Sequence, residues 1–236
     1  MQRFRTILFD LDGTLLNFEE AERVALSNAL AEFRLPCSEN IQYLYHSINK
    51  RLWEQFELGL VSKEDLTVQR FKELLEAMEV HIDAACMNRT YQTALSHCAI
   101  LEHDAPEVCG RLAARCRLYV VTNGTAAVQY SRLKESGLEQ YFRDIFISEE
   151  LGAHKPEEAF FEKVFDRIHC SEAEKPEVLL VGDTISSDIK GALRAGVAAC
   201  WYNPLREKNY SSLTPHYEIR TLSELPGIVG IGADSI

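Results

Sequence analysis

The sequence predicts an α/β protein in which a doubly wound parallel sheet is combined with an inserted all-helical domain. Three observations carry this prediction. Short apolar runs recur along the chain, helical patterns lie between them, and one long segment holds no convincing strand. The runs are continuously apolar, which is typical of strands buried on both faces of a sheet. Because strands and helices alternate, we expect about five parallel strands.

The expected strands are short and apolar, and most of them end at polar residues. They cover residues 5–9, 117–122, 144–148, 178–182 and 197–202. Signals for the ends of helices lie between them. Asp104 with Pro106 begins one helix, and Gly196 ends another.

A long region, residues 17–97, follows the first strand and shows helical periodicity instead. Ser62-Lys-Glu-Asp65 is a capping signal at the start of one helix, and apolar residues after Pro36 recur at helical spacing. A segment of this length is not a structureless loop in a compact domain. We therefore expect a Rossmann-like core of residues 1–16 and 98–236 with a helical domain inserted. Four aromatic residues of that domain are expected by periodicity to lie mostly in its interior, with one of them left as a candidate platform for stacking on a substrate base: Tyr43, Tyr45, Trp53 and Phe56.

The composition limits the classes of partner. The chain has 25 Lys and Arg against 36 Asp and Glu, a formal net charge of -11, which argues against binding to nucleic acid or an anionic membrane. A small anionic substrate needs only one local positive site. No apolar run approaches the roughly 18 residues of a membrane span, and the opening lacks the apolar stretch of a signal peptide. Seven scattered cysteines without a CxxC pair indicate reduced thiols. We expect a cytoplasmic protein, either a monomer or a homodimer.

Four polar clusters lie at or shortly after the ends of predicted strands. Ligands bind at this edge in open α/β sheets. They are Asp10 to Thr14, Thr122 to Gly124, Lys155 with Pro156, and Gly182 to Asp188. Four carboxylates that converge on one crevice repel each other unless a cation or protons intervene. Mg²⁺ suits such a site, because it binds one or two carboxylates and keeps water and phosphate oxygens as its other ligands. The clusters therefore indicate a phosphoryl-transfer site.

Each cluster also has a structural interpretation when it is taken alone. Asp10 and Asp12 precede Gly13, and Asp-Gly is a common turn. Lys155 alone would be read as a surface lysine. Asp188 lies in the first turn of a predicted helix, where the helix dipole favours an acid. The order of all four clusters along the chain favours a shared site.

In order and spacing, these four clusters resemble the motifs of the haloacid dehalogenase superfamily, and the helical insert resembles its C1-type cap. The motifs bracket residues 6–188, so the resemblance covers the core. It implies that Asp10 attacks phosphorus to form an aspartyl-phosphate. Asp12 would protonate the leaving oxygen and later accept a proton from water. Dehalogenases of the superfamily lack an acid–base aspartate there and work without metal, so Asp12 favours a phosphatase or phosphomutase.

The resemblance also implies a cofactor and a phosphate site. Thr122, the amide of Asn123 and Lys155 would hold the transferring phosphoryl group, with Thr122 and Lys155 contributing to catalysis. The cofactor would be Mg²⁺, bound by the side chain of Asp10, the main-chain carbonyl of Asp12 and the side chain of Asp183, with Asp188 in support.

Finer features resemble the branch of pyrimidine 5′-nucleotidases. They are Thr122-Asn-Gly-Thr125, the run from Asp183 to Ala192, and Trp201-Tyr-Asn-Pro204. The expected activity is Mg²⁺-dependent hydrolysis of a small phosphorylated metabolite, a nucleoside 5′-monophosphate. Two alternatives remain open: a sugar-phosphate phosphatase or phosphomutase, and a non-catalytic interaction protein that retains the fold. The second is disfavoured because no motif position is degraded.

Overall fold

The computed structural model describes residues 3–231 of the chain, which divides into two compact units. The core unit holds the residues up to Asn17 and those from Leu101 onward. The helical unit is Phe18–Ile100.

The core unit is built on a six-stranded parallel sheet in the order β3-β2-β1-β4-β5-β6. Its strands are β1 (Thr6–Phe9), β2 (Arg117–Thr122), β3 (Asp144–Ile147), β4 (Val178–Gly182), β5 (Ala198–Tyr202) and β6 (Tyr217–Ile219). In the register of the sheet, Thr6 of β1 lies between Arg117 and Val178. The first strand is therefore central, and the two strands beside it come from distant parts of the chain.

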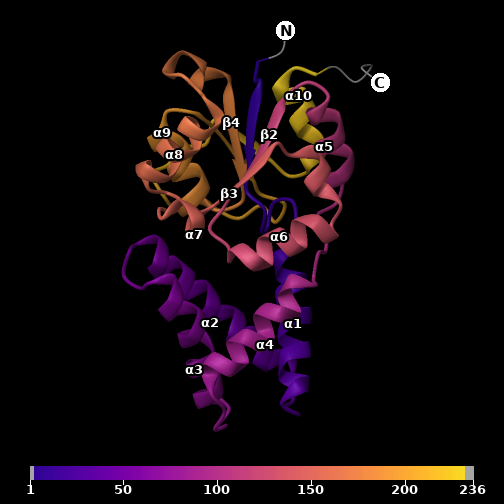
Figure 1. Cartoon of the computed structure of the whole chain (residues 1–236), viewed down its shortest axis with the longest axis vertical. Coiled ribbons are helices and arrows are strands. Elements are labelled where there is room, and N and C mark those ends of the chain that lie inside the picture. Colours follow the sequence, from indigo (N-terminus) through magenta and orange to yellow (C-terminus); the bar gives the residue numbers. More distant parts are fainter. Residues whose placement is uncertain (1–2, 232–236) are drawn as a thin grey trace. The chain divides into compact units, whose positions relative to one another are not determined.

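Helices cover both faces of this sheet. They are α5 (Ala105–Ala113), α6 (Ala126–Glu135), η1 (Leu138–Tyr141), α7 (Ser148–Leu151), α8 (Glu158–Ile168), η2 (Glu172–Glu177), η3 (Ile185–Ile189), α9 (Lys190–Ala195), η4 (Leu222–Glu224) and α10 (Leu225–Val229). Figure 1 shows α8 and α9 on one side of the strands and α5 and α10 on the other.

Alternate side chains of the central strand enter two separate apolar layers. Ile7 and Phe9 pack with Val108 of α5, whereas Leu8 packs with Phe161 of α8. Side chains on a strand point alternately to the two faces of a sheet, so a continuously apolar strand fills both layers. The predicted fold class, a doubly wound parallel sheet with a helical insert, is confirmed.

Among the strands within residues 3–231, the edge strand β6 is the one that the sequence analysis does not predict. It has 3 residues and pairs only with β5, where Tyr217 lies opposite Cys200. An edge strand this short carries too few residues for a pattern of burial to be recognised.

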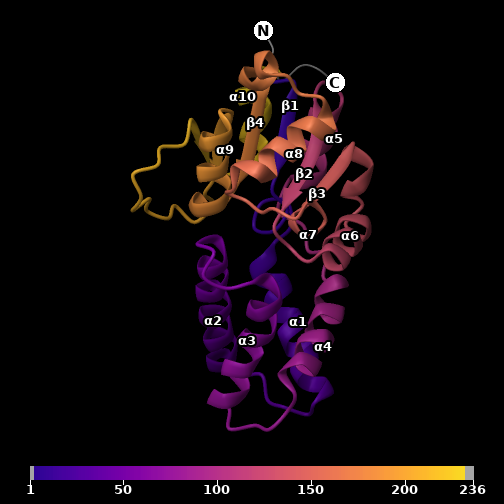
Figure 2. The ribbon, with the colours of Figure 1, turned by 60° about the vertical axis from the view of Figure 1, so that its left-hand side comes forward.

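The helical unit consists of α1 (Phe18–Glu32), α2 (Glu39–Glu57), α3 (Lys63–Ala77) and α4 (Ala84–Ser96). Contacts join α1 to α4, α2 to α3 and α3 to α4, and Figure 2 shows the four helices running alongside one another. Ser62 caps α3 as predicted, since its hydroxyl accepts a hydrogen bond from the Asp65 amide at 3.1 Å.

Aromatic rings fill the interior of the helical unit. Tyr45, Phe71 and Tyr91 pack with ring centroids 5.1–5.5 Å apart. Tyr43 is 76% exposed and is an exception to the expectation that these aromatic residues lie mostly in the interior. Because successive helical residues are rotated by about 100°, Tyr43 points nearly opposite to Tyr45 on α2. Phe56 is buried as expected.

Two further observations concern the chain as a whole. Each of the seven cysteines is a free thiol. Within residues 3–231, no helix combines the length and the apolar character needed to cross a bilayer.

Candidate active site

The polar clusters of the sequence lie at the carboxyl ends of the central strands. Asp10 follows β1, Thr122 ends β2 and Asp183 follows β4. Asp188 lies on the π-helical turn η3, and Lys155 lies on the segment between α7 and α8. Neighbouring parallel strands end at the same edge of a sheet, so residues far apart in the sequence come into direct contact there.

The Lys155 side chain contacts the ends of β1 and β2 and the turn η3 that follows β4. Its ammonium nitrogen lies 2.5 Å from Asp10 Oδ1, 2.7 Å from Asp188 Oδ1 and 2.8 Å from the Val121 carbonyl oxygen. The side chain is 2% exposed. All three ammonium protons therefore have protein acceptors, and a phosphoryl oxygen that binds Lys155 directly must replace one of them.

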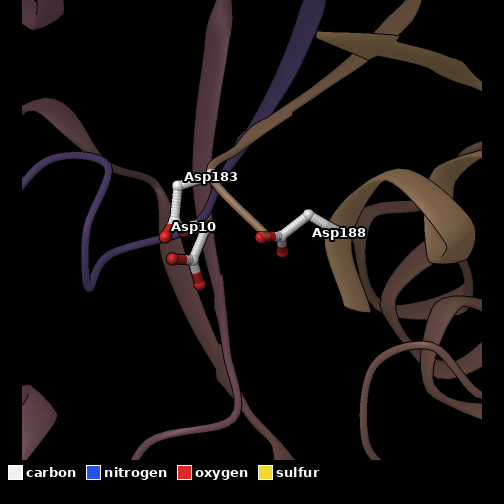
Figure 3. Close-up of side chains that lie close together, drawn as sticks. All are labelled: Asp10, Asp183 and Asp188. Atoms are coloured by element: carbon white, nitrogen blue, oxygen red, sulfur yellow. The ribbon is translucent and has the colours of Figure 1, made fainter. Parts of the chain in front are cut away.

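The acidic side chains outnumber this lysine. Figure 3 shows Asp10 and Asp183 next to each other, with the Asp188 carboxylate turned toward them. One carboxylate oxygen from each of the three lies within 4.8 Å of the others. Three carboxylates and one ammonium leave excess negative charge in a buried place, and hard divalent cations bind such oxygen clusters.

The electrostatics of the cluster follow from burial and crowding. Burial raises the pKa of Asp10 well above its usual value; Lys155 opposes this rise, and Asp188 and Asp183 add to it. Burial and the neighbouring Asp188 raise the pKa of Asp183 to about 7. Burial alone would lower the pKa of Lys155, but Asp10 and Asp188 outweigh it and raise that pKa. The lysine therefore stays charged, while the carboxylates compete for protons or for a cation.

Two contacts fix Asp183 in the cluster. The chain turns tightly after β1 at Gly13, which has φ +78° and lies so close that a Cβ there would be 2.6 Å from Asp183 Oδ2. Only glycine combines this backbone conformation with that approach. On the other side, the Trp201 indole donates a hydrogen bond to the Asp183 carbonyl oxygen at 2.7 Å. The Trp201 motif thus supports an acidic loop of the site.

The Asn123 side chain anchors the segment that carries Lys155. Its amide nitrogen donates to the Lys155 carbonyl oxygen at 2.9 Å, and its amide oxygen accepts from the Lys155 main-chain nitrogen at 2.9 Å. This pair of bonds engages the amide oxygen and one amide N–H of the Asn123 side chain with the Lys155 backbone, and the main-chain N–H of Asn123 is the group expected to bind phosphate.

The Asp12 carboxylate is directed toward α6 and is not part of the three-acid cluster. Arg132 binds its Oδ1, and Gln129 donates to its Oδ2 at 2.6 Å. Sequence reasoning missed both partners, because polar residues on an amphipathic helix are normally assigned to its solvated face. The usable signal was their spacing of three, which places them on the same face of α6.

A match to a family model identifies the family of this chain. Residues 7–202 match the family model of the haloacid dehalogenase-like hydrolases. The chain belongs to this family. It is therefore an enzyme of the hydrolase class.

Known members of the family are similar over nearly the whole chain. The HAD-hydrolase YfnB of Bacillus subtilis is 38% identical over 98% of this chain and 97% of its own length. The pyrimidine 5′-nucleotidase PynA of Streptococcus pneumoniae is 36% identical over 94% of this chain and 93% of its own. The crystal structure of YfnB bound to magnesium has a TM-score of 0.92 and 38% identity, covering 98% of this chain and 100% of that one.

Proposed function

We propose that the protein is a Mg²⁺-dependent phosphomonoester hydrolase that acts through an aspartyl-phosphate on Asp10, with a pyrimidine-type nucleoside 5′-monophosphate as substrate. The observation that carries the proposal is the set of three carboxylates, two of them buried and that of Asp183 half-buried, around one buried lysine at the strand ends. The similarity to PynA supports the choice of substrate, and the magnesium bound to YfnB supports the choice of metal. The expected location in the cytoplasm stays a prediction.

The donor set fits Mg²⁺. Asp10, Asp183 and Asp188 offer only carboxylate oxygens, which are hard ligands, and their mutual repulsion falls when a divalent cation binds among them. The main-chain carbonyl of Asp12 is the proposed fourth protein ligand. When bound, the ion neutralises charge on the phosphate oxygens and so makes the phosphorus open to attack by an anion.

One hydrogen bond of Asp10 supports the choice of its reacting atom. Lys155 donates to Oδ1, which favours Oδ2 as the oxygen that attacks phosphorus. As the bond from Oδ2 to phosphorus forms, the ester bond to the leaving oxygen breaks. Asp12 donates a proton to that oxygen, and the product leaves as an alcohol.

The second half of the reaction restores Asp10. A water oxygen bonds to phosphorus while the bond between phosphorus and Asp10 breaks, and Asp12 accepts a proton from the water. Phosphate leaves, and Asp12 is protonated again for the next cycle. Lys155 and the main-chain N–H of Asn123 supply positive charge and a hydrogen bond to the phosphoryl oxygens.

Thr122 is suited to donate a hydrogen bond to the phosphoryl group. Its oxygen accepts from the Gly124 amide at 3.0 Å and from Gln129 at 3.2 Å. Both lone pairs are then engaged, and the hydroxyl proton is what Thr122 can offer to an anion.

A substrate panel tests this proposal. Phosphate release is measured from pyrimidine and purine nucleoside 5′-monophosphates, hexose phosphates and phosphoglycolate, with Mg²⁺ and with excess chelator. We expect the highest kcat/KM for a pyrimidine nucleotide, and no release with chelator. Equal rates across the panel would contradict the nucleotide assignment, and isomerised sugar phosphate without phosphate release would identify a mutase. No turnover of any phosphomonoester would refute the hydrolase itself.

A further inference from the structure

The acid–base residue is held by two side chains that the proposed chemistry does not use. Arg132 is 0% exposed and binds Asp12 Oδ1. Gln129 is 1% exposed and donates to Asp12 Oδ2 at 2.6 Å. Both oxygens of the carboxylate are thereby engaged from α6, a helix that carries no residue of the predicted site.

The same glutamine reaches the phosphate site. Its amide nitrogen lies 3.2 Å from Thr122 Oγ1 as well as 2.6 Å from Asp12 Oδ2. A primary amide has two N–H groups, and here one points at each oxygen. One side chain thus connects the residue that transfers protons to the hydroxyl expected to hold the phosphoryl group.

Glycine at position 124 leaves room for the Gln129 side chain. A Cβ at position 124 would lie 1.6 Å from the Gln129 amide nitrogen, which is far closer than any contact allows. Every residue other than glycine would therefore push Gln129 away from Asp12 and Thr122. The glycine of Thr122-Asn-Gly124 therefore allows the Gln129 side chain to lie between Asp12 and Thr122.

We propose that Gln129 and Arg132 are positioning residues. They hold the Asp12 carboxylate in one orientation and at a fixed position relative to the Thr122 hydroxyl. This inference rests on the proposed function, because it acts through the acid–base role of Asp12. An unrestrained carboxylate has several rotamers, and general acid–base catalysis requires the proton-transferring atom within hydrogen-bond reach of its partner. Loss of the Gln129 or the Arg132 side chain should slow proton transfer by Asp12 without weakening substrate binding.

The test uses Arg132→Met and Gln129→Leu, which remove the polar groups and keep a similar volume. Each should lower kcat about 10–100-fold, a part of the about 10²–10⁴-fold typical of general acid–base catalysis, with KM changed less than about twofold. Arg132→Lys, which retains the charge, should recover part of the loss. Lys134→Met removes a cation from the exposed side of the same helix and is the matched control.

Two readouts separate positioning from a general loss of structure. With p-nitrophenyl phosphate, whose leaving group departs without a proton, the variants should keep the rate of the first step, and only the water step, which needs Asp12 as a base, should be slowed. Arg132→Met should then give a burst of nitrophenolate equal to the active sites. In an Asp12→Asn background, Arg132→Met and Gln129→Leu should have no further effect on the residual rate. Thermal melting of each variant identifies those that fail to fold, and either substitution alone suffices for the test.

The outcomes distinguish this inference from the proposed function. If both variants fold and keep the wild-type kcat, or lose the same factor in the Asp12→Asn background, the positioning role is wrong. If Asp10→Asn is inactive at the same time, the proposed hydrolase stands without it. Full turnover by Asp10→Asn would instead refute the proposed function.

Discussion

Each unit buries a network of charged side chains, and the two networks differ in how their charges balance. In the core unit, Asp10, Asp183 and Asp188 surround a single Lys155. In the helical unit, the Glu22 carboxylate accepts from Asn49 at 2.6 Å, and Asn49 in turn accepts from Arg70 at 3.0 Å. One network has a surplus of anions, whereas the other pairs one anion with one cation through an amide.

The difference shows which buried network needs a ligand. A buried charge is costly unless it is paired and hydrogen-bonded. Arg70 also donates to Asn88 at 3.0 Å and to the Thr67 carbonyl at 3.1 Å, so hydrogen bonds within the helical unit satisfy it. The core cluster has no comparable balance among the described residues, and we expect a divalent cation to supply the charge that its own side chains lack. The first network is expected to bind and react, and the second to stabilise.

The largest effect is expected from Asp10→Asn. The amide keeps the volume of the side chain but is a far weaker nucleophile, so kcat should fall by about 10⁴-fold or more. Phosphate release and thermal melting are measured together. A folded variant with a near-normal rate would show that Asp10 is not the nucleophile and that the core cluster has another purpose.

Mg²⁺ should stabilise the protein, and more at pH 8 than at pH 6. The pKa of Asp183 lies at about 7 in the folded chain, above its value of about 4 in the unfolded chain. The folded state therefore holds the proton more tightly, so metal-free stability falls as the pH rises from about 4 to 7. Below pH 7, Mg²⁺ must displace protons. Melting curves with and without Mg²⁺ measure this. A Mg²⁺ effect that is the same at both pH values would contradict it, and Asp183→Asn should remove most of it.

In the helical unit, Arg70→Met should affect stability and leave the metal site unchanged. The substitution leaves the buried oxygen of Asn49 without its Arg70 donor, at about 1–3 kcal/mol, and the half-buried oxygen of Asn88 loses the same donor at a smaller cost. Denaturant unfolding measures the loss. Arg51→Met is the control, because it removes a half-exposed partner of Glu73 and should cost at most about 1 kcal/mol. Altered Mg²⁺ affinity in Arg70→Met would contradict the assignment of a purely stabilising role to the network of the helical unit.

The smallest effect concerns His46, which lies 2.8 Å from Glu22. The hydrogen bond to Glu22 raises the pKa of His46, against a smaller opposing effect of burial. A raised histidine pKa stabilises the folded state below pH 6.5, and this contribution is lost as the pH rises through the folded value. The difference in unfolding free energy between the wild type and His46→Gln should therefore be larger at pH 6 than at pH 9. A difference that grows with pH would show that the pair is absent in solution.

The sequence predicts the sheet well because its central strands are buried on both faces and read as continuous apolar runs. Motif order also indicates that Asp10, Thr122, Lys155 and Asp183 share one edge, and the structure brings the strand ends together there. Sequence periodicity fails where the environment opposes the usual rule. Arg132 is charged yet completely buried, and Tyr43 is aromatic yet exposed.

Phosphate release from a pyrimidine nucleoside 5′-monophosphate, measured for the wild type and Asp10→Asn with Mg²⁺ and with excess chelator, is the decisive experiment. We expect rapid release only from the wild type with Mg²⁺, since the surplus carboxylates need the cation and the reaction needs the Asp10 oxygen. Release that persists in chelator, or in Asp10→Asn at a similar rate, would contradict the account.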